Sequence, residues 1–298
     1  MASLGEGGAA DQENLARSGQ TPRREWARRN ERLKAMLARD AEILAAEQPD
    51  AIVVDGRATP VLLKARQPLF HLANWLGYAS FMQRVRGAPP FPLGEGQLLI
   101  PGVEAIEGRA DRPGMFFGPM VWAGWTRLSS ASPPGPSDIL LSFGSTGEAG
   151  RLAPWLARNL PGRYRVSALG AVSLEGRPDA AVFPAGPLAP HLALTRVVLC
   201  HGGHGTVMES LLNGRPLIVF PRNIEQLEIG RRIQRLGLGR LVDRPRNELE
   251  PARLEAMIES LVADPRVHAE LARVSALLRA QSGAAGAAAA LREALPSA

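Results

Sequence analysis

The stretch from Cys200 to Gly239 constrains the fold of this chain more than any other segment. It is typical of a strand, a glycine-rich turn, a helix, a second strand, a polar turn and a second helix. We predict the first helix over Thr206–Leu212, because Gly214 can end it and Pro216 prevents its continuation. Such a unit points helix N-termini and free backbone N–H groups into one crevice, which suits a diphosphate.

Five motifs in this stretch occur in an order that resembles the nucleotide-sugar site of the GT-B glycosyltransferases. They are HGGHGT, a Glu three residues later, GRP, a strand that ends in Pro, and EQ. The set is similar to that of the UDP-glycosyltransferase-like family, which includes the macrolide and natural-product glycosyltransferases. The resemblance implies an α/β fold in which two Rossmann-like βαβ domains face a cleft. It also implies an inverting glycosyltransferase that moves a sugar from a UDP- or dTDP-type donor to a hydroxyl of a small lipophilic or lipid acceptor.

The resemblance assigns roles to individual residues of the predicted donor site. Glu209 binds the ribose hydroxyls, Glu225 and Gln226 bind the donor sugar, and Phe183 flanks the base. The usual pair is Asp-Gln, so the Glu-Gln of this chain leaves the sugar open. The alternatives are an exposed helix position for Glu209, strand core for Phe183, and a plain tight turn for the loop that follows Phe143. The diphosphate is assigned to two glycine-rich loops, at Gly144, Ser145, Thr146, His201, Gly202, Gly203, Gly205 and Thr206.

His201 and His204 have an HxxH spacing that also raises the question of a metal site. A glycine-rich turn is a poor scaffold for fixed ligands, and the sequence supplies no further Cys or His cluster to complete the coordination. We therefore expect no metal, and no cofactor besides the nucleotide sugar as co-substrate.

The acceptor side of the predicted site is less complete. In the resembled family a His on an early loop acts as the general base, and an Asp on a later strand end orients it. Asp55 matches that Asp, as the orienting carboxylate, but the first histidine in the chain is His71. We expect His71 to lie in a loop or a cleft wall and not to replace the base. The resemblance thus covers roughly residues 40 to 298, and we expect the opening of the N-terminal domain to be missing.

A second class of function therefore stands beside the enzyme. The chain could be a catalytically silent nucleotide-sugar-binding protein or an auxiliary subunit, because a positioned base is typically worth about 10²–10⁴ in rate. The predicted nucleotide-sugar-binding domain fits the enzyme and the silent binding protein equally well. A nucleotide-sugar epimerase on the same fold fits HGGHGT poorly.

Composition shifts predict the domain organisation. We expect residues 1–20 to form a disordered, polar, glycine-rich tail, residues 21–128 a partial acceptor-side domain, residues 129–137 a linker, and residues 138–298 the nucleotide-sugar-binding domain. Thr21 and Pro22 start a helix that runs to about Ala46. A strand from Pro49 to Asp55, a helix over 61–66 and a strand at Leu69–Leu72 then predict a parallel sheet.

Charge and cysteine content limit the partners and the compartment. The net charge is +6, but the basic residues are dispersed arginines and the chain has only five Trp and two Tyr, so we expect no nucleic-acid partner. The lone Cys200 follows an apolar strand, which predicts core packing and fits a reducing cytoplasm. We expect no signal peptide and no membrane span. Peripheral membrane contact stays open, because the Arg-rich first helix is amphipathic.

Overall fold

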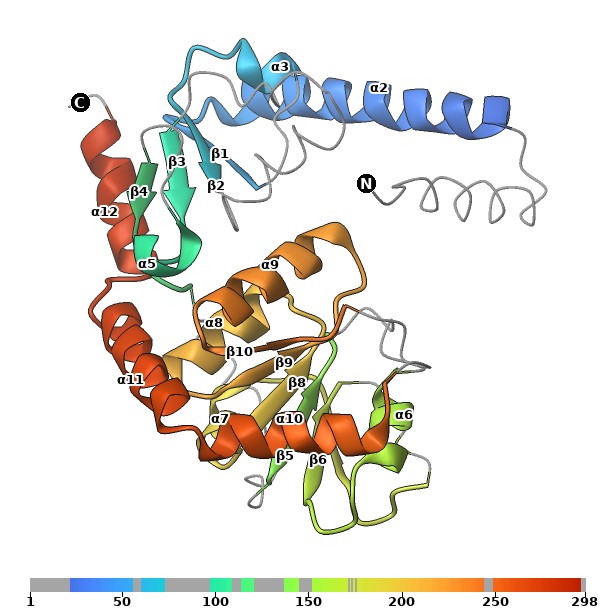
Figure 1. The fold of residues 1–298 in the computed structure, drawn as a ribbon. Coiled ribbons are helices and arrows are strands. Elements are labelled where there is room, and N and C mark those ends of the chain that lie inside the picture. The colour runs from blue at the N-terminus through green and yellow to red at the C-terminus, as the bar shows by residue number, and fades with distance from the viewer. Residues whose placement is uncertain are drawn as a thin grey trace, which may run out of the picture. The chain divides into compact units, whose positions relative to one another are not determined.

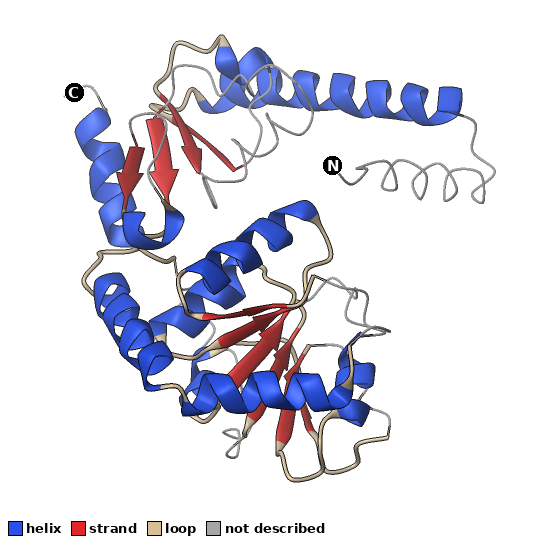
Figure 2. Ribbon diagram, in the orientation of Figure 1, coloured by secondary structure: helices blue, strands red, loops and turns tan. Residues whose placement is uncertain are grey.

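The computed structural model describes residues 22–55, 60–72, 97–108, 114–120, 137–144, 152–170, 172, 174, 176–243 and 249–295. The chain separates into two compact units, whose helices and strands are drawn in Figures 1 and 2. The first unit comprises residues 1–71 and 92–96, and the second comprises residues 72–91 and 97–298. The predicted linker at 129–137 lies outside the described residues except for Ser137, so the predicted domain boundaries stay predictions.

The first unit consists of a long helix followed by a strand–helix–strand segment. Its elements are α2 (Pro22–Glu47), β1 (Ile52–Asp55), α3 (Pro60–Leu63) and β2 (Leu69–Leu72). Ile52 and Val54 are buried against apolar residues that include Leu44, whereas Val53 between them is 49% exposed. This alternation shows that β1 buries one face. The predicted order of elements is confirmed, although the helix predicted over 61–66 is shorter.

The second unit contains a parallel sheet of six strands in the order β10-β9-β8-β5-β6-β7. The strands β5, β6, β8 and β9 are buried along their whole length, as expected for a parallel sheet with both faces covered. The bounds are β5 (Ile139–Ser142), β6 (Val166–Leu169), β7 (Ala181–Phe183), β8 (Val197–Cys200), β9 (Leu217–Val219) and β10 (Gly239–Leu241). A doubly wound α/β arrangement results, which confirms the predicted class.

Helices connect and flank these strands (Figure 1). Helix α9 contacts β9 and β10, α10 contacts β8, and α8 packs against both α7 and α11. The bounds are α6 (Leu152–Asn159), α7 (Ala189–Ala193), α8 (His204–Leu212), α9 (Ile224–Arg235), α10 (Pro251–Ala263), α11 (Pro265–Arg279) and α12 (Ala284–Ala294). The helical C-terminal region predicted from Pro251 to Leu295 is therefore three helices. Asp264 separates two of them, because its side chain accepts a hydrogen bond from Arg266 N and caps α11.

The second unit also holds a parallel pair of strands, β3 (Gln97–Ile100) and β4 (Gly114–Phe116), with the short helix α5 (Glu104–Glu107) between them. The end of β4 packs on the α11–α12 junction, where Gly283 N donates to Phe117 O at 2.7 Å. No helix among the described residues is both long and apolar enough to cross a bilayer.

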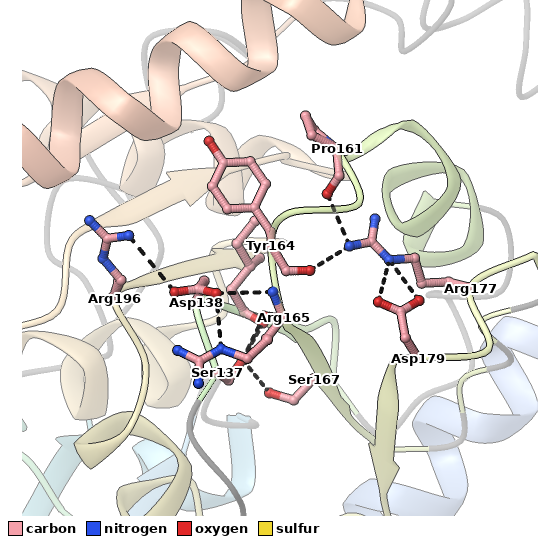
Figure 3. Close-up of polar contacts among 10 residues, drawn as sticks. Ser137, Asp138, Pro161, Tyr164, Arg165, Ser167, Arg177, Asp179 and Arg196 are labelled. Carbon is pink, nitrogen blue, oxygen red and sulfur yellow. Dashed lines mark hydrogen bonds and ion pairs between the residues drawn. The ribbon is translucent and has the colours of Figure 1, made fainter.

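A polar network braces the amino ends of β5 and β6 (Figure 3). Asp138, just before β5, accepts hydrogen bonds from Arg165 N at 3.0 Å and from Arg165 Nε at 3.2 Å. Burial opposes ionisation of Asp138, but these bonds and the charges of Arg165 and Arg196 hold its pKa below the usual value. Arg177 donates to Leu160 O at 2.6 Å and to Pro161 O at 3.0 Å, so it binds the carbonyls that follow α6.

Candidate functional site

The strand order places a topological switch point between β5 and β8. From β5 the chain adds β6 and β7 on one side of the sheet, and β8, β9 and β10 then extend the other side. Connections leave the carboxyl ends of the two central strands in opposite directions, which is where open α/β sheets bind ligands. The loops that follow Ser142 and Cys200 both begin at this point.

The side chain of His201 joins these two loops. A Cβ added at Gly144 would lie 3.2 Å from His201 Cε1, and a Cβ added at Gly203 would lie 2.6 Å from His201 Nε2. The imidazole therefore lies against both glycines, and Gly144 adopts a φ of +79° that disfavours any other residue. The structure thus brings together the two loops that the sequence assigned to one diphosphate.

Helix α8 begins at this point with an uncapped N-terminus. Its N-cap residue is Gly203, no side-chain cap is seen among the described residues, and the first hydrogen bond within the helix runs from Val207 N to Gly203 O at 3.0 Å. The backbone N–H groups of the first turn therefore have no intrahelical acceptor. A Cβ added at Gly205 would meet no atom within 4 Å, so there is open space beside these donors. Uncapped donors and the positive end of the helix dipole favour an anion here.

The helix starts two residues earlier than predicted, at His204 instead of Thr206. Because Gly203 already has the extended backbone of an N-cap, with φ −63° and ψ 136°, the next two residues can be helical. Gly202 packs closely against β9: its φ is +90°, and a Cβ there would lie 2.8 Å from Val219 Cγ1. Cys200 is fully buried, and burial raises the pKa of its thiol to about 12, which confirms a packing role.

Glu209 lies one turn into α8 and is half-buried. Its peptide carbonyl accepts hydrogen bonds from Asn213 N and Nδ2, but within the described part of the chain no hydrogen bond reaches its carboxyl group. Burial raises the pKa of this carboxyl. A half-buried carboxylate without an internal partner is suited to accept hydrogen bonds from ligand hydroxyls.

The predicted sugar-binding pair occupies the first turn of α9. Asn223 caps this helix by accepting a hydrogen bond from Gln226 N at 2.9 Å, and Gln226 Oε1 accepts one from Arg222 N at 2.8 Å. Gln226 is 8% exposed, so its amide carbonyl is committed to the turn. Glu225 is half-buried beside it. The predicted sugar contacts stay predictions, and the structure adds a capping role for Gln226.

Phe183 ends β7, at the same carboxyl edge of the sheet, and is half-buried. The edge of one ring meets the face of the other between Phe183 and His191, with centroids 4.7 Å apart. His191 is buried, and its burial lowers the pKa of the imidazole. Phe183 is therefore held by α7 but keeps part of its ring accessible, and the base-flanking role stays a prediction.

Several predicted residues lie outside what the structure describes. Ser145 and Thr146 are outside the described residues, and Asp55 is the last residue of β1 with a side chain that is not described. His71 corrects an expectation: it lies within β2, not in a loop or cleft wall, and is 1% exposed. The strand predicted at Leu69–Leu72 is confirmed, and its two central residues, Phe70 and His71, are both buried. His71 therefore cannot meet an acceptor.

The structure also shows a pair that the sequence reading missed. His204 Nε2 lies 3.2 Å from Oε1 of Glu107, whose side chain is fully buried, at 0% exposure. The sequence reading weighed His204 only as a metal ligand, and no local pattern could connect it with Glu107, 97 residues away. Among the described residues no three His, Cys, Asp or Glu side chains gather where they could hold a metal ion.

Comparisons with known proteins bear on this geometry. Residues 178–288 match the glycosyltransferase family 28 C-terminal domain. Demethyllactenocin mycarosyltransferase of Streptomyces fradiae is 30% identical over 145 residues, which cover 47% of this chain and 30% of that protein. UDP-sugar-dependent glycosyltransferase 52 of Dictyostelium discoideum is 37% identical over 87 residues, covering 29% of this chain and 5% of that protein. The chain therefore spans less than a third of the length of either relative.

Solved structures share the fold over most of the chain. The glycosyltransferase of kitacinnamycin has a TM-score of 0.68 and 19% identity over 88% of this chain and 80% of that one. The calicheamicin glycosyltransferase CalG4 has a TM-score of 0.67 and 22% identity over 88% and 79%. Spinosyn rhamnosyltransferase SpnG, solved with thymidine diphosphate, has a TM-score of 0.63 and 19% identity over 88% and 78%. The chain thus has the GT-B fold, as predicted.

Proposed function

Because the chain carries a glycosyltransferase family 28 C-terminal domain on a GT-B fold, we propose that it binds a nucleotide-activated sugar at the carboxyl ends of β5 and β8. The proposed donor is of the UDP or dTDP type, and the proposed reaction is inverting transfer of its sugar to a hydroxyl of a small lipophilic or lipid acceptor. The uncapped N-terminus of α8 beside His201, at the switch point of the sheet, is the observation that carries this proposal.

The chemistry needs stabilisation of a leaving diphosphate. In the proposed transfer, the bond between the anomeric carbon and the diphosphate oxygen breaks while the acceptor oxygen forms a new bond on the opposite face. Negative charge then grows on the diphosphate, next to the first-turn N–H groups of α8 and the His201 imidazole. Donors that are already in place stabilise such charge without reorganisation, which favours the transition state over the ground state. Glu209 would hold the ribose, and Glu225 with Gln226 would face the sugar.

The first-turn N–H groups of α8 and the His201 imidazole supply the proposed diphosphate site with donors from the chain itself. We therefore propose a metal-independent reaction, with the nucleotide sugar as the co-substrate and no other cofactor. The single, buried Cys200 fits the cytoplasmic location that we propose.

One observation favours a second candidate function. Inverting transfer also needs a group that accepts the proton of the attacking hydroxyl, and His71, the first histidine of the sequence, is buried in β2. A protein that binds the nucleotide sugar and does not transfer it would show the same donor site. Binding and turnover must therefore be measured separately.

The first test is nucleotide binding by the full chain. UDP or dTDP at 100 times its Kd should stabilise the protein by about 2.7 kcal/mol, a shift of several degrees in thermal unfolding. His201→Ala should weaken this shift, and His268→Ala, on an exposed face of α11, should leave it unchanged. No shift with either nucleotide at millimolar concentration would contradict the proposed donor site.

The same protein then decides between the two candidates. With UDP- and dTDP-sugars and a panel of hydroxylated lipophilic acceptors, release of nucleotide diphosphate that persists in EDTA supports the metal-independent enzyme. Binding without release of diphosphate or of free sugar supports the silent binding protein.

A further inference from the structure

A buried carboxyl group lies next to the proposed diphosphate site. Glu107 ends the short helix α5, and its side chain is fully buried. Its Oε1 lies 3.2 Å from Nε2 of His204, the first residue of α8. The N–H group of His204 belongs to the first turn of α8, so the pair connects Glu107 with the backbone donors of the proposed site.

Other contacts fix Glu107 in place. A Cβ added at Gly102 would lie 2.2 Å from Glu107 Oε1, so only glycine at this position leaves room for the carboxyl group. Arg232 of α9 donates from Nε to Ile106 O at 2.7 Å, next to Glu107 in the chain. Helix α5 is therefore held from α9 on one side and contacts the start of α8 through Glu107.

Stabilisation of the fold is a poor explanation for the contact between Glu107 and His204. Glu107 Oε2 is buried and has no hydrogen-bond partner in the part of the chain that the structure describes. Burial of a carboxyl group with one oxygen unpaired is costly, and a buried polar group contributes to stability only when it is fully hydrogen-bonded. A stabilising role therefore accounts poorly for Glu107, whereas a role in holding His204 accounts for its placement.

We propose that Glu107 is a positioning residue for the donor site: it holds His204, and through it the first turn of α8, in the geometry that binds the diphosphate. Glu107 does not touch the ligand, because its carboxyl group is buried. The inference rests on the proposed function and extends it to the β3–β4 segment, which the sequence assigned to the acceptor-side domain. Residues of the β3–β4 segment would then affect how tightly the glycine-rich loop before α8 binds the diphosphate.

The test compares a diphosphate with its nucleoside in the full chain. Whichever of UDP and dTDP binds the wild-type protein more tightly is titrated, together with uridine or thymidine. Glu107→Met keeps the volume and removes the hydrogen bond, and Glu107→Gln keeps an acceptor oxygen but removes the charge. The matched control is Glu104→Met, an exposed position on the same helix α5.

We expect Glu107→Met to raise the Kd of the diphosphate about three- to tenfold, as for loss of one hydrogen bond, with the nucleoside Kd unchanged and Tm unchanged or higher. Glu107→Gln should lie between it and the wild type, and Glu104→Met should match the wild type. Adding His204→Leu to Glu107→Met should weaken binding no further, because the two residues act together.

The outcomes separate this inference from the proposed function. If the wild-type protein binds the nucleotide and both Glu107 variants bind it equally well, the positioning role is wrong and the proposed function stands. If both variants lose diphosphate and nucleoside affinity in parallel with a lower Tm, Glu107 is merely structural. If the wild-type protein binds neither nucleotide, the proposed function falls and this inference falls with it.

Discussion

Helices α8 and α9 follow neighbouring strands of one sheet, but their N-termini are built differently. Helix α9 is capped by its own sequence, because Asn223 accepts from Gln226 N and Gln226 accepts from Arg222 N. Helix α8 follows a glycine, Gly203, and in the part of the chain that the structure describes no side-chain cap is seen. Both helices follow parallel strands that pair with each other, β8 and β9, so the sheet itself does not cause the difference.

The contrast shows which helix end is self-sufficient and which can accept a ligand. The cap of α9 satisfies one first-turn donor, Gln226 N, and such a cap is worth about 1 kcal/mol relative to Ala. The N-terminus of α8, with Gly203 at the N-cap, has no such acceptor among the described residues, so its donors are open to an external acceptor. The glycine turn before α8 therefore leaves backbone donors for the proposed anion site.

The largest expected effect comes from adding a negative charge to the open N-terminus. Gly205→Glu should raise stability by about 0.5–1 kcal/mol from helix propensity and by a further 0.3–1 kcal/mol from a carboxylate near the helix N-terminus. It should weaken UDP or dTDP binding by about 30-fold or more, because like charges repel at short range. Unfolding curves and nucleotide titrations measure the two effects on one sample.

Gly205→Ala is the matched control, because it gains helix propensity without charge and has room for its Cβ. It should be stabilised without a comparable loss of affinity. Unchanged nucleotide affinity in Gly205→Glu would show that the start of α8 is not the anion site.

A smaller effect is expected from Glu209, whose pKa is raised by burial. The folded protein then binds this proton more tightly than the unfolded chain, so the contribution of Glu209 to stability falls as pH rises from about 4.5 through its folded pKa. Gln cannot ionise, so Glu209→Gln avoids this loss of stability. Its Tm should therefore exceed that of the wild type at pH 7, and the difference should vanish toward pH 4. Thermal unfolding across this pH range measures it.

The same substitution should raise the nucleotide Kd about tenfold, because an amide offers one acceptor oxygen where the carboxylate offers two. Glu293→Gln, at an exposed position of α12, serves as the control for both measurements. A variant that binds the nucleotide as tightly as wild type would remove Glu209 from the ribose role.

The smallest effect concerns the capped helix. Asn223→Ala should destabilise the protein by about 1 kcal/mol and lower Tm by about 2–4 °C, and Asn223→Asp should retain the cap. Nucleotide affinity should stay within about twofold of wild type, since the α9 cap serves the fold. If Asn223→Ala instead lost the diphosphate as Gly205→Glu does, the two helix ends would not differ in role.

Local patterns were enough to predict the elements of the donor half. The glycine turn after Cys200, the apolar strand before it and the stop at Gly214 and Pro216 each act within a few residues, and the observed β8 and α8 follow them. The long helix from Pro22 was predicted for the same reason, because Pro at its first position is a local signal. The strand over Leu69–Leu72 was also predicted, but the expectation that His71 lies in a loop or cleft wall was wrong, because burial of a side chain depends on the elements that pack on it and not on the local sequence.

The sequence by itself determined the order of strands and helices and the glycine turn that can approach a phosphate, because these depend on backbone freedom and hydrophobic period along the chain. Only the tertiary structure decided that Gly144 meets His201, that Gln226 closes the start of α9, and that Glu107 reaches His204 across 97 residues. These contacts depend on strand order and helix packing, which no spacing within a segment encodes. The same stretch of chain therefore predicts a donor site, while residues distant in the sequence determine the contacts around it.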